Sequence, residues 1–163
     1  MTRDYAAFVR NNRVPAMAPL RASLTALGLD DVASSGSSGN FVFCSTHDRD
    51  RDSLERRISV ALDAEVLVRT RDEVRDLVAN DAYRDVPGSI VFLLKGEVDP
   101  RSRVLADATG PGGEHPVATP GALYFVNPTR LPGRRALVDF ESELGVRGTR
   151  RTSRVLARVL AMM

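Results

Sequence analysis

The first 70 residues alternate strand-like and helix-like segments in an order that restricts the fold. Three segments are apolar runs of strand length, namely residues 5–9, 40–45 and 65–68, and Val32 lies in a brief further strand candidate after the first of them. Two segments between them place apolar residues at helical spacing. The resulting order of strand, helix, strand, strand, helix and strand predicts a ferredoxin-like unit, in which two helices cover one face of a four-stranded antiparallel sheet.

Both helical segments carry recognisable start signals. The first opens at Pro15, which suits the first turn of a helix, and stops at Gly28. Its apolar face consists of four residues at i, i+3, i+7 and i+10: Met17, Leu20, Leu24 and Leu27. The second follows a polar stretch, residues 48–52, in which acidic and basic residues alternate and neutralise one another. Asp52 or Ser53 is its predicted N-cap.

Residues 34–43 pass from a Ser- and Gly-rich turn directly into an apolar strand. Gly36 and Gly39 can adopt positive φ without steric cost, so the stretch predicts a hairpin turn that leads into a central strand. Successive amides in such a turn can also bind an anion, and Ser38 and Asn40 would then contribute polar groups. The stretch lacks the spacing of a nucleotide-binding loop, and a solvated hairpin connection is the alternative.

Residues 71–163 also alternate helix and strand, which suggests a degenerate second copy of the same plan. The expected elements are a helix at 71–80 with Thr70 as its cap, a strand at 90–94, a short helix from 99 to 106, hairpin arms at 115–118 and 122–126, and helices at 135–144 and 149–163. We therefore predict an α+β fold class, a two-layer sandwich of two ferredoxin-like halves with antiparallel sheets and C-terminal helices. The halves are residues 1–70 and 71–163, joined in one compact unit.

The composition is that of a globular protein, with 43% hydrophobic residues, 27% charged residues and a formal net charge of +2. Cys44 is the single cysteine, which excludes an intramolecular disulfide and a Cys-rich metal site. No segment has the apolar length of a signal-peptide core or of a membrane span. We expect a cytoplasmic monomer or homodimer that contacts no membrane and uses neither a metal nor another cofactor.

Arginines concentrate toward the C-terminus, where eight lie between residues 130 and 163 against three acidic residues. On the predicted helix 149–163, Arg150, Arg154 and Arg158 are spaced at i, i+4 and i+8 and would share one face. Such a face can bind the phosphates of a small molecule or a nucleic acid, because a planar guanidinium matches a phosphate with two hydrogen bonds. The alternative is a solvated amphipathic helix whose arginines complement the helix dipole, since no aromatic residues interleave with them for stacking.

Residues that carry acid–base or nucleophilic chemistry show no useful spacing. His47 and His115 are far apart and lie among polar residues, which favours ordinary surface positions. Cys44 and His47 are three positions apart, so in a strand their side chains would point to opposite faces. The sequence therefore offers no defensible catalytic pair.

Several short motifs occur in an order that covers most of the chain. They are Arg13-Val14-Pro15-Ala16-Met17-Ala18-Pro19-Leu20-Arg21, Ser38-Gly39-Asn40-Phe41-Val42-Phe43, Val66-Leu67-Val68-Arg69-Thr70, and Leu144-Gly145-Val146 followed by Thr149-Arg150. Together they resemble the bacterial family called domain of unknown function 1697. The resemblance implies two related α+β halves, similar to ferredoxin-like units, and a function that is not established for the family.

Two loops depart from the family pattern. Members usually carry Arg-Gly-Ile-Asn-Val-Gly-Gly after the first strand, where this chain has Arg10-Asn11-Asn12-Arg13. They also carry Arg-Asn-Trp near the last helix, where this chain has Arg150-Arg151-Thr152. If these loops form the family's site, the resemblance implies a divergent binder or an inactive relative.

These observations lead to the hypothesis of a non-catalytic binder of an anionic ligand, either a phosphate-bearing small molecule or a nucleic acid. The candidate ligand-binding residues are Arg10, Asn12, Arg13, Ser38, Asn40, Arg150, Arg151 and Arg154. The alternative is an enzyme acting on a phosphorylated small molecule where the Arg10 loop, the Ser38 turn and the Arg150 segment meet. A structural or partner-binding module is a third hypothesis, which exposure of Val155, Val159 and Met162 would support.

Overall fold

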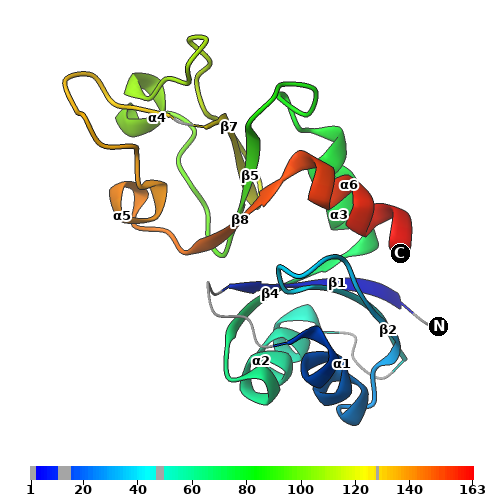
Figure 1. Cartoon of the computed structure of the whole chain (residues 1–163). Coiled ribbons are helices and arrows are strands. Elements are labelled where there is room, and N and C mark those ends of the chain that lie inside the picture. Colours follow the sequence, from blue (N-terminus) through cyan, green and yellow to red (C-terminus); the bar gives the residue numbers. More distant parts are fainter. Residues whose placement is uncertain (1–2, 11–15, 47–49, 128) are drawn as a thin grey trace. The chain divides into compact units, whose positions relative to one another are not determined.

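The computed structural model describes residues 3–10, 16–46, 50–127 and 129–163. The chain divides into two compact units. The first unit is Met1–Asp76 together with Val155–Met163, and the second unit is Leu77–Arg154. Each unit contains one four-stranded antiparallel sheet (Figure 1).

The first unit follows the order of elements predicted for the first 70 residues. Its elements are β1 (Arg3–Arg10), α1 (Met17–Ala26), β2 (Asp30–Ser34), β3 (Asn40–Ser45), α2 (Arg51–Leu62), β4 (Glu65–Thr70) and the first turns of α3 (Arg71–Ala79). The strands lie in the order β2-β3-β1-β4, and each neighbouring pair is antiparallel. α1 and α2 cover one face of this sheet (Figure 1).

The apolar sequence of β1 suits its central position in the sheet, where both of its faces are buried. Side chains alternate across a strand, and Tyr5, Ala7 and Val9 belong to the core formed with α1 and α2. Ala6 and Phe8, which point to the other face, are also fully buried. A strand that is buried on both faces requires a continuous apolar run, and β1 carries one.

Side chains cap the start of α2 and of α3. Asp50 accepts hydrogen bonds from the amides of Asp52 and Ser53 at 3.2 and 3.1 Å. The predicted N-cap at Asp52 or Ser53 is therefore wrong, because Asp50 has the extended backbone of a cap and both residues already lie within α2. Thr70 and Glu73 form a capping box at α3, with reciprocal amide-to-side-chain hydrogen bonds of 3.2 and 2.7 Å. The predicted cap at Thr70 is confirmed.

The second unit repeats the plan of the first. Its elements are β5 (Ser89–Leu94), α4 (Arg103–Asp107), β6 (Val117–Thr119), β7 (Ala122–Val126), α5 (Phe140–Leu144), β8 (Gly148–Thr152) and the start of α6 (Ser153–Met162). The strand order β6-β7-β5-β8 gives each strand the place of its counterpart in the first unit. The predicted α+β class, with two layered βαββαβ halves and antiparallel sheets, is confirmed.

β8 corrects the predicted helix at 149–163. Residues 148–152 pair with the central strand β5, and the helix begins only at Ser153. The threonines of β8 suit a strand. Gly148 allows close pairing, since a Cβ at this position would lie 2.6 Å from Cε2 of Phe92. Pairing with a buried strand thus outweighs the helical spacing of the arginines.

Three short elements also begin later than predicted. The helix predicted at 99–106 spans Arg103–Asp107, the hairpin arm predicted at 115–118 spans Val117–Thr119, and the helix predicted at 135–144 spans Phe140–Leu144. The last is short because Arg130 pairs through its backbone with Thr109 and with Leu137, so residues 130–137 form a hairpin and not a helix. None of the helices in the described ranges combines the length and apolar character that crossing a bilayer requires.

Candidate anion-binding site

Arg150 is an exposed residue of β8, and an aromatic ring orients it. It pairs with Phe92 across the sheet, which places its side chain on the face covered by α4 and α5. The guanidinium carbon lies 5.9 Å from the centroid of the Phe125 ring, within the range of a cation–π contact. Phe125 packs in turn on Phe140 at a centroid distance of 4.8 Å. A buried aromatic pair therefore supports the arginine.

Arg151, the next residue, is 9% exposed and points to the opposite face of the sheet. Its Nη1 donates to Oγ1 of Thr149 at 2.8 Å and to the carbonyl oxygen of Arg150 at 2.7 Å. Burial lowers the pKa of Arg151 to about 10, so the guanidinium remains charged at neutral pH. Its hydrogen bonds hold the backbone of β8 beside Arg150.

The structure divides the three arginines that were predicted to share one helix face. Arg150 lies in β8, whereas Arg154 and Arg158 lie one turn apart on α6. All three are exposed, and so is Arg147, just before β8. Neither Arg154 nor Arg158 forms an ion pair within the described part of the chain. Residues 144–163 contain five arginines and no acidic residue, so this stretch is strongly basic.

The candidates at the end of β1 lie in the first unit. Nη1 of Arg10 donates to Oε2 of Glu65 at 2.7 Å, across a pair of facing residues in β1 and β4. This ion pair balances the charge of Arg10. Asn12 and Arg13 lie outside the described residues.

The Ser38 turn closes on itself through backbone and side-chain hydrogen bonds. The amide of Ser35 donates to the carbonyl oxygen of Asn40 at 2.8 Å, and Nδ2 of Asn40 donates to the carbonyl oxygen of Ser35 at 3.2 Å. Gly36 and Gly39 both have φ of +69°, as the turn requires. Asn40 is buried and Ser38 is exposed. The side chain of Asn40 thus stabilises the turn, in agreement with a hairpin connection.

Within the first unit, the Ser38 turn lies beside the end of β1. The amide of Val9 donates to the carbonyl oxygen of Gly39 at 2.8 Å. Two of the three segments predicted to form one site are therefore neighbours. Arg150 belongs to the second unit, and its approach to them stays a prediction.

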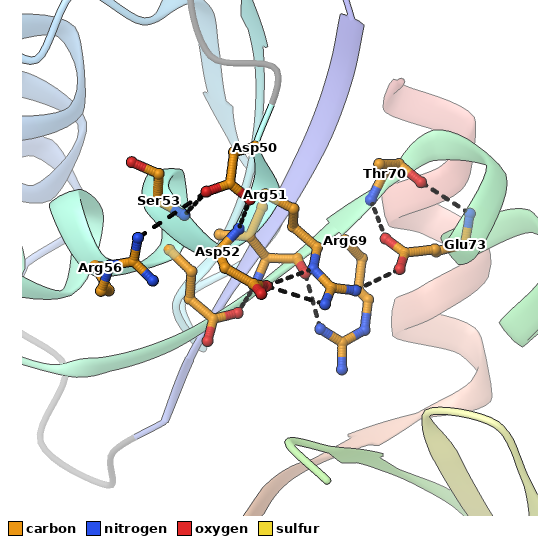
Figure 2. A network of polar contacts seen from close by, with 10 residues as sticks. Asp50, Arg51, Asp52, Ser53, Arg56, Arg69, Thr70 and Glu73 are labelled. Carbon is orange, nitrogen blue, oxygen red and sulfur yellow. Dashed lines mark hydrogen bonds and ion pairs between the residues drawn. The ribbon is translucent and has the colours of Figure 1, made fainter. Parts of the chain in front are cut away.

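A polar network in the first unit was not predicted (Figure 2). The guanidinium of Arg51 donates to Oε1 of Glu73 at 2.6 Å and to Oδ1 of Asp52 at 3.0 Å. These contacts connect the first turns of α2 and α3. Nearby, Oε2 of Glu55 accepts a hydrogen bond from the amide of Val68 at 2.9 Å. The network ties both helices to the edge strand β4.

The buried Arg69 in this network has a counterpart in the second unit. Arg69 of β4 faces Ala6 of its central strand, and Arg151 of β8 faces Val91 of its own. Nη1 of Arg69 donates to the preceding carbonyl oxygen at 2.8 Å, as Nη1 of Arg151 does. Burial lowers the pKa of both guanidinium groups. The Arg-Thr pairs at 69–70 and 151–152, each followed by a helix, are the sequence signal of this repeat.

The remaining chemistry-bearing residues do not assemble a reactive site in the described ranges. No group of three or more histidine, cysteine and acidic side chains there could hold a metal ion. Sγ of Cys44 donates to Oδ1 of Asp4 at 3.3 Å, and burial, with help from Asp4, raises the thiol pKa to about 11. Nδ1 of His115 lies 3.0 Å from the carbonyl oxygen of Ala108. His47 lies outside the described residues.

The exposure proposed for a partner-binding face is only partly present. Met162 is 39% exposed, but Val159 is fully buried and Val155 is half-buried. The apolar side of α6 thus faces mainly into the protein.

Comparison with known proteins extends these observations. Residues 3–124 match the model of a family described as "Protein of unknown function (DUF1697)". Among solved structures, the chain is similar to the conserved bacterial protein SP0830 from Streptococcus pneumoniae, with a TM-score of 0.65, 19% sequence identity and 99% of each chain covered. At this identity the likeness concerns the fold alone. No curated protein matches the chain.

Proposed function

The chain belongs to the family "Protein of unknown function (DUF1697)", and from this premise we propose that it binds an anionic, phosphate-bearing ligand without catalysing a reaction on it. The proposal rests on the exposed Arg147, Arg150 and Arg154, which lie close in sequence in a stretch of the second unit that has no acidic residue. We call these three residues the β8 arginines. The negative charge of a phosphate-bearing ligand complements these guanidinium groups.

The local structure favours binding at Arg150 and Arg154 in different ways. The Phe125 ring restricts Arg150, so less side-chain freedom is lost when a ligand binds. Arg154 lies in the first turn of α6, where the positive end of the helix dipole adds to its charge. Arg151 supports Arg150 through the backbone and is proposed as a positioning residue.

The candidates of the first unit form a second part of this proposal. Arg10, Asn12, Arg13, Ser38 and Asn40 would contribute polar groups to the same class of ligand. Arg10 would have to share its charge with Glu65 to do so. We therefore assign the larger part of the binding energy to the β8 arginines.

Native mass spectrometry of protein purified gently from its host tests the proposal. A phosphate-bearing adduct is expected on the wild-type protein and should be lost from Arg150→Ser/Arg154→Ser. The control is Arg21→Ser/Arg101→Ser, which removes the same charge from two exposed arginines that form no ion pair among the described residues. Calorimetric titration with inorganic pyrophosphate detects binding that is too weak to give an adduct in native mass spectrometry.

Equal pyrophosphate affinity in the wild type and in Arg150→Ser/Arg154→Ser would refute the proposed site. A bound ligand that is converted to product would instead support an enzyme acting on a phosphorylated small molecule. An adduct that is a protein would support the partner-binding module.

A further inference from the structure

A short hairpin in the second unit carries a second group of arginines. Residues 129–138, here called the basic hairpin, turn at Pro132-Gly133. Gly133 has φ of +72°, and the amide of Arg134 donates to the carbonyl oxygen of Leu131 at 3.2 Å. Proline followed by a residue with positive φ is the arrangement of a type II turn. The tip of the hairpin is therefore well defined by its local sequence.

The base of the basic hairpin is anchored to the rest of the second unit. Arg130 exchanges two backbone hydrogen bonds with Thr109, at 2.8 and 2.9 Å, and the amide of Val138 donates to the carbonyl oxygen of Thr129 at 3.0 Å. Thr129 is 3% exposed, and its hydroxyl donates to the carbonyl oxygen of Val126 at 2.8 Å. Hydrogen bonds thus hold the base of the hairpin to the rest of the second unit.

The arginines of the basic hairpin are exposed. Arg134 forms an ion pair with Glu143 of α5, which balances the charge of this arginine. Arg130 and Arg135 form no ion pair with any described residue. Between residues 130 and 154 the chain has seven arginines and three acidic residues, so the segment that includes both groups remains positive.

Aromatic contacts connect the basic hairpin with the β8 arginines. Phe140 follows the hairpin and opens α5, and its ring packs on Phe125. The Phe125 ring in turn lies under Arg150. Because the three side chains share one face of the sheet, the chain passes from the hairpin to Arg150 on a single side of the second unit.

We propose that the basic hairpin and the β8 arginines form one surface that binds the phosphate backbone of a nucleic-acid duplex. This inference rests on the proposed anion binding and extends it from a single phosphate group to the repeated phosphates of a nucleic-acid backbone. Five exposed arginines contribute: Arg130, Arg135, Arg147, Arg150 and Arg154. They come from the hairpin, from β8 and the position just before it, and from the start of α6, and five guanidinium groups carry more charge than one phosphate balances.

The aromatic residues of this surface decide between duplex and single strand. Single-strand binders stack bases on exposed aromatic side chains. Phe125 and Phe140 are 3% and 0% exposed, so neither ring can accept a base. Recognition therefore depends on charge and shape, which suits a duplex that displays only its backbone and grooves.

Fluorescence anisotropy with a labelled mixed-sequence duplex tests the inference. Affinity falls with salt by a slope of roughly −0.9 for each phosphate neutralised, so five arginines predict a slope of about −4.5 for log affinity against log salt. Arg130→Ser/Arg135→Ser should weaken duplex binding by about 10-fold, reduce the slope by about two, and leave pyrophosphate binding unchanged. Arg150→Ser/Arg154→Ser should weaken both probes, and Arg21→Ser/Arg101→Ser neither.

Two results would overturn the inference and leave the proposed function intact. One is unchanged duplex affinity and salt slope in Arg130→Ser/Arg135→Ser, with pyrophosphate binding still dependent on Arg150 and Arg154. The other is tighter binding of a single strand of the same sequence than of the duplex. If Arg150→Ser/Arg154→Ser changes neither probe, both the inference and the proposed function are wrong. Matching thermal unfolding of all variants confirms that each is folded.

Discussion

At the scale of single residues, Gly148 shows how closely β8 approaches its neighbour. The absence of a side chain at this position allows the ring of Phe92 to pack against the strand. Arg150 and Arg151 are placed by this pairing, one on each face of the sheet. The site therefore depends on a residue that carries no functional group.

Gly148→Ala should destabilise the protein by about 1–3 kcal/mol, because the added Cβ would lie 2.6 Å from Cε2 of Phe92 and the strand would have to shift. Urea unfolding measures the loss. Gly96→Ala is the matched control, since its Cβ would meet Val146 at an ordinary 3.5 Å and the change should stay within about 0.5 kcal/mol. Equal stability of the two variants would contradict the strand pairing described here.

Cys44 should react slowly with iodoacetamide in the folded protein. Burial and Asp4 raise its thiol pKa from 9.0 to about 11, so at pH 8 the reactive thiolate is roughly 100-fold scarcer than for an ordinary thiol. The rate should climb as pH rises toward 11 and approach that of a free thiol in urea. Equal rates for the folded and unfolded chain at pH 8 would show that the thiol is unperturbed.

At the scale of elements, the edge strand β4 has its outward amides occupied by side chains. Ser59 and Glu55 of α2 accept from Val66 and Val68 at 3.2 and 2.9 Å. Glu73 of α3 accepts from Thr70 at 2.7 Å. An edge strand with free amides invites pairing with another chain, and these contacts protect β4 from it.

Glu73→Ala should destabilise the protein by about 1–2 kcal/mol, since it removes the α3 capping box and the ion pair with Arg51 together. Glu73→Gln keeps a side-chain acceptor for the amide of Thr70 and loses only the charge, so its loss should be smaller. Chemical unfolding of both variants separates the two contributions. Identical losses would assign the whole effect to the ion pair.

At the scale of the whole molecule, the chain is a duplicated βαββαβ plan in which the end of the chain returns to the first unit. Arg71 donates to the terminal Met163 carbonyl oxygen at 2.6 Å and forms an ion pair with Asp4 at 3.1 Å. The boundary predicted between residues 70 and 71 stays a prediction.

Deletion of residues 155–163 should weaken the first unit more than the second. The segment carries the buried Leu156 and Val159, each worth about 1.5–3 kcal/mol when fully buried. Hydrogen exchange of the truncated chain should show lost protection in β1 and β4 and retained protection in β5 and β7. The reverse pattern would argue against assigning the segment to the first unit.

The predictable part of the molecule consists of features that depend on neighbouring residues. A continuous apolar run located the strand at 40–45, the Ser and Gly turn before it has the positive φ angles expected, and Thr70 caps α3. The N-cap of α2 was misplaced because Asp50, Asp52 and Ser53 offer similar local signals, and only the backbone conformation distinguishes them. Such errors shift an element without changing the fold.

The sequence by itself determined the order of elements in the first 70 residues, the fold class and the basic character of the C-terminal segment, because periodicity, turn residues and charge are local properties. Tertiary structure alone decided that Arg150 lies in a strand, that Arg151 is buried and that Arg10 is paired with Glu65. The reason is that strand pairing, burial and long-range ion pairs depend on residues distant in the sequence. An isolated arginine pattern contains no information about them.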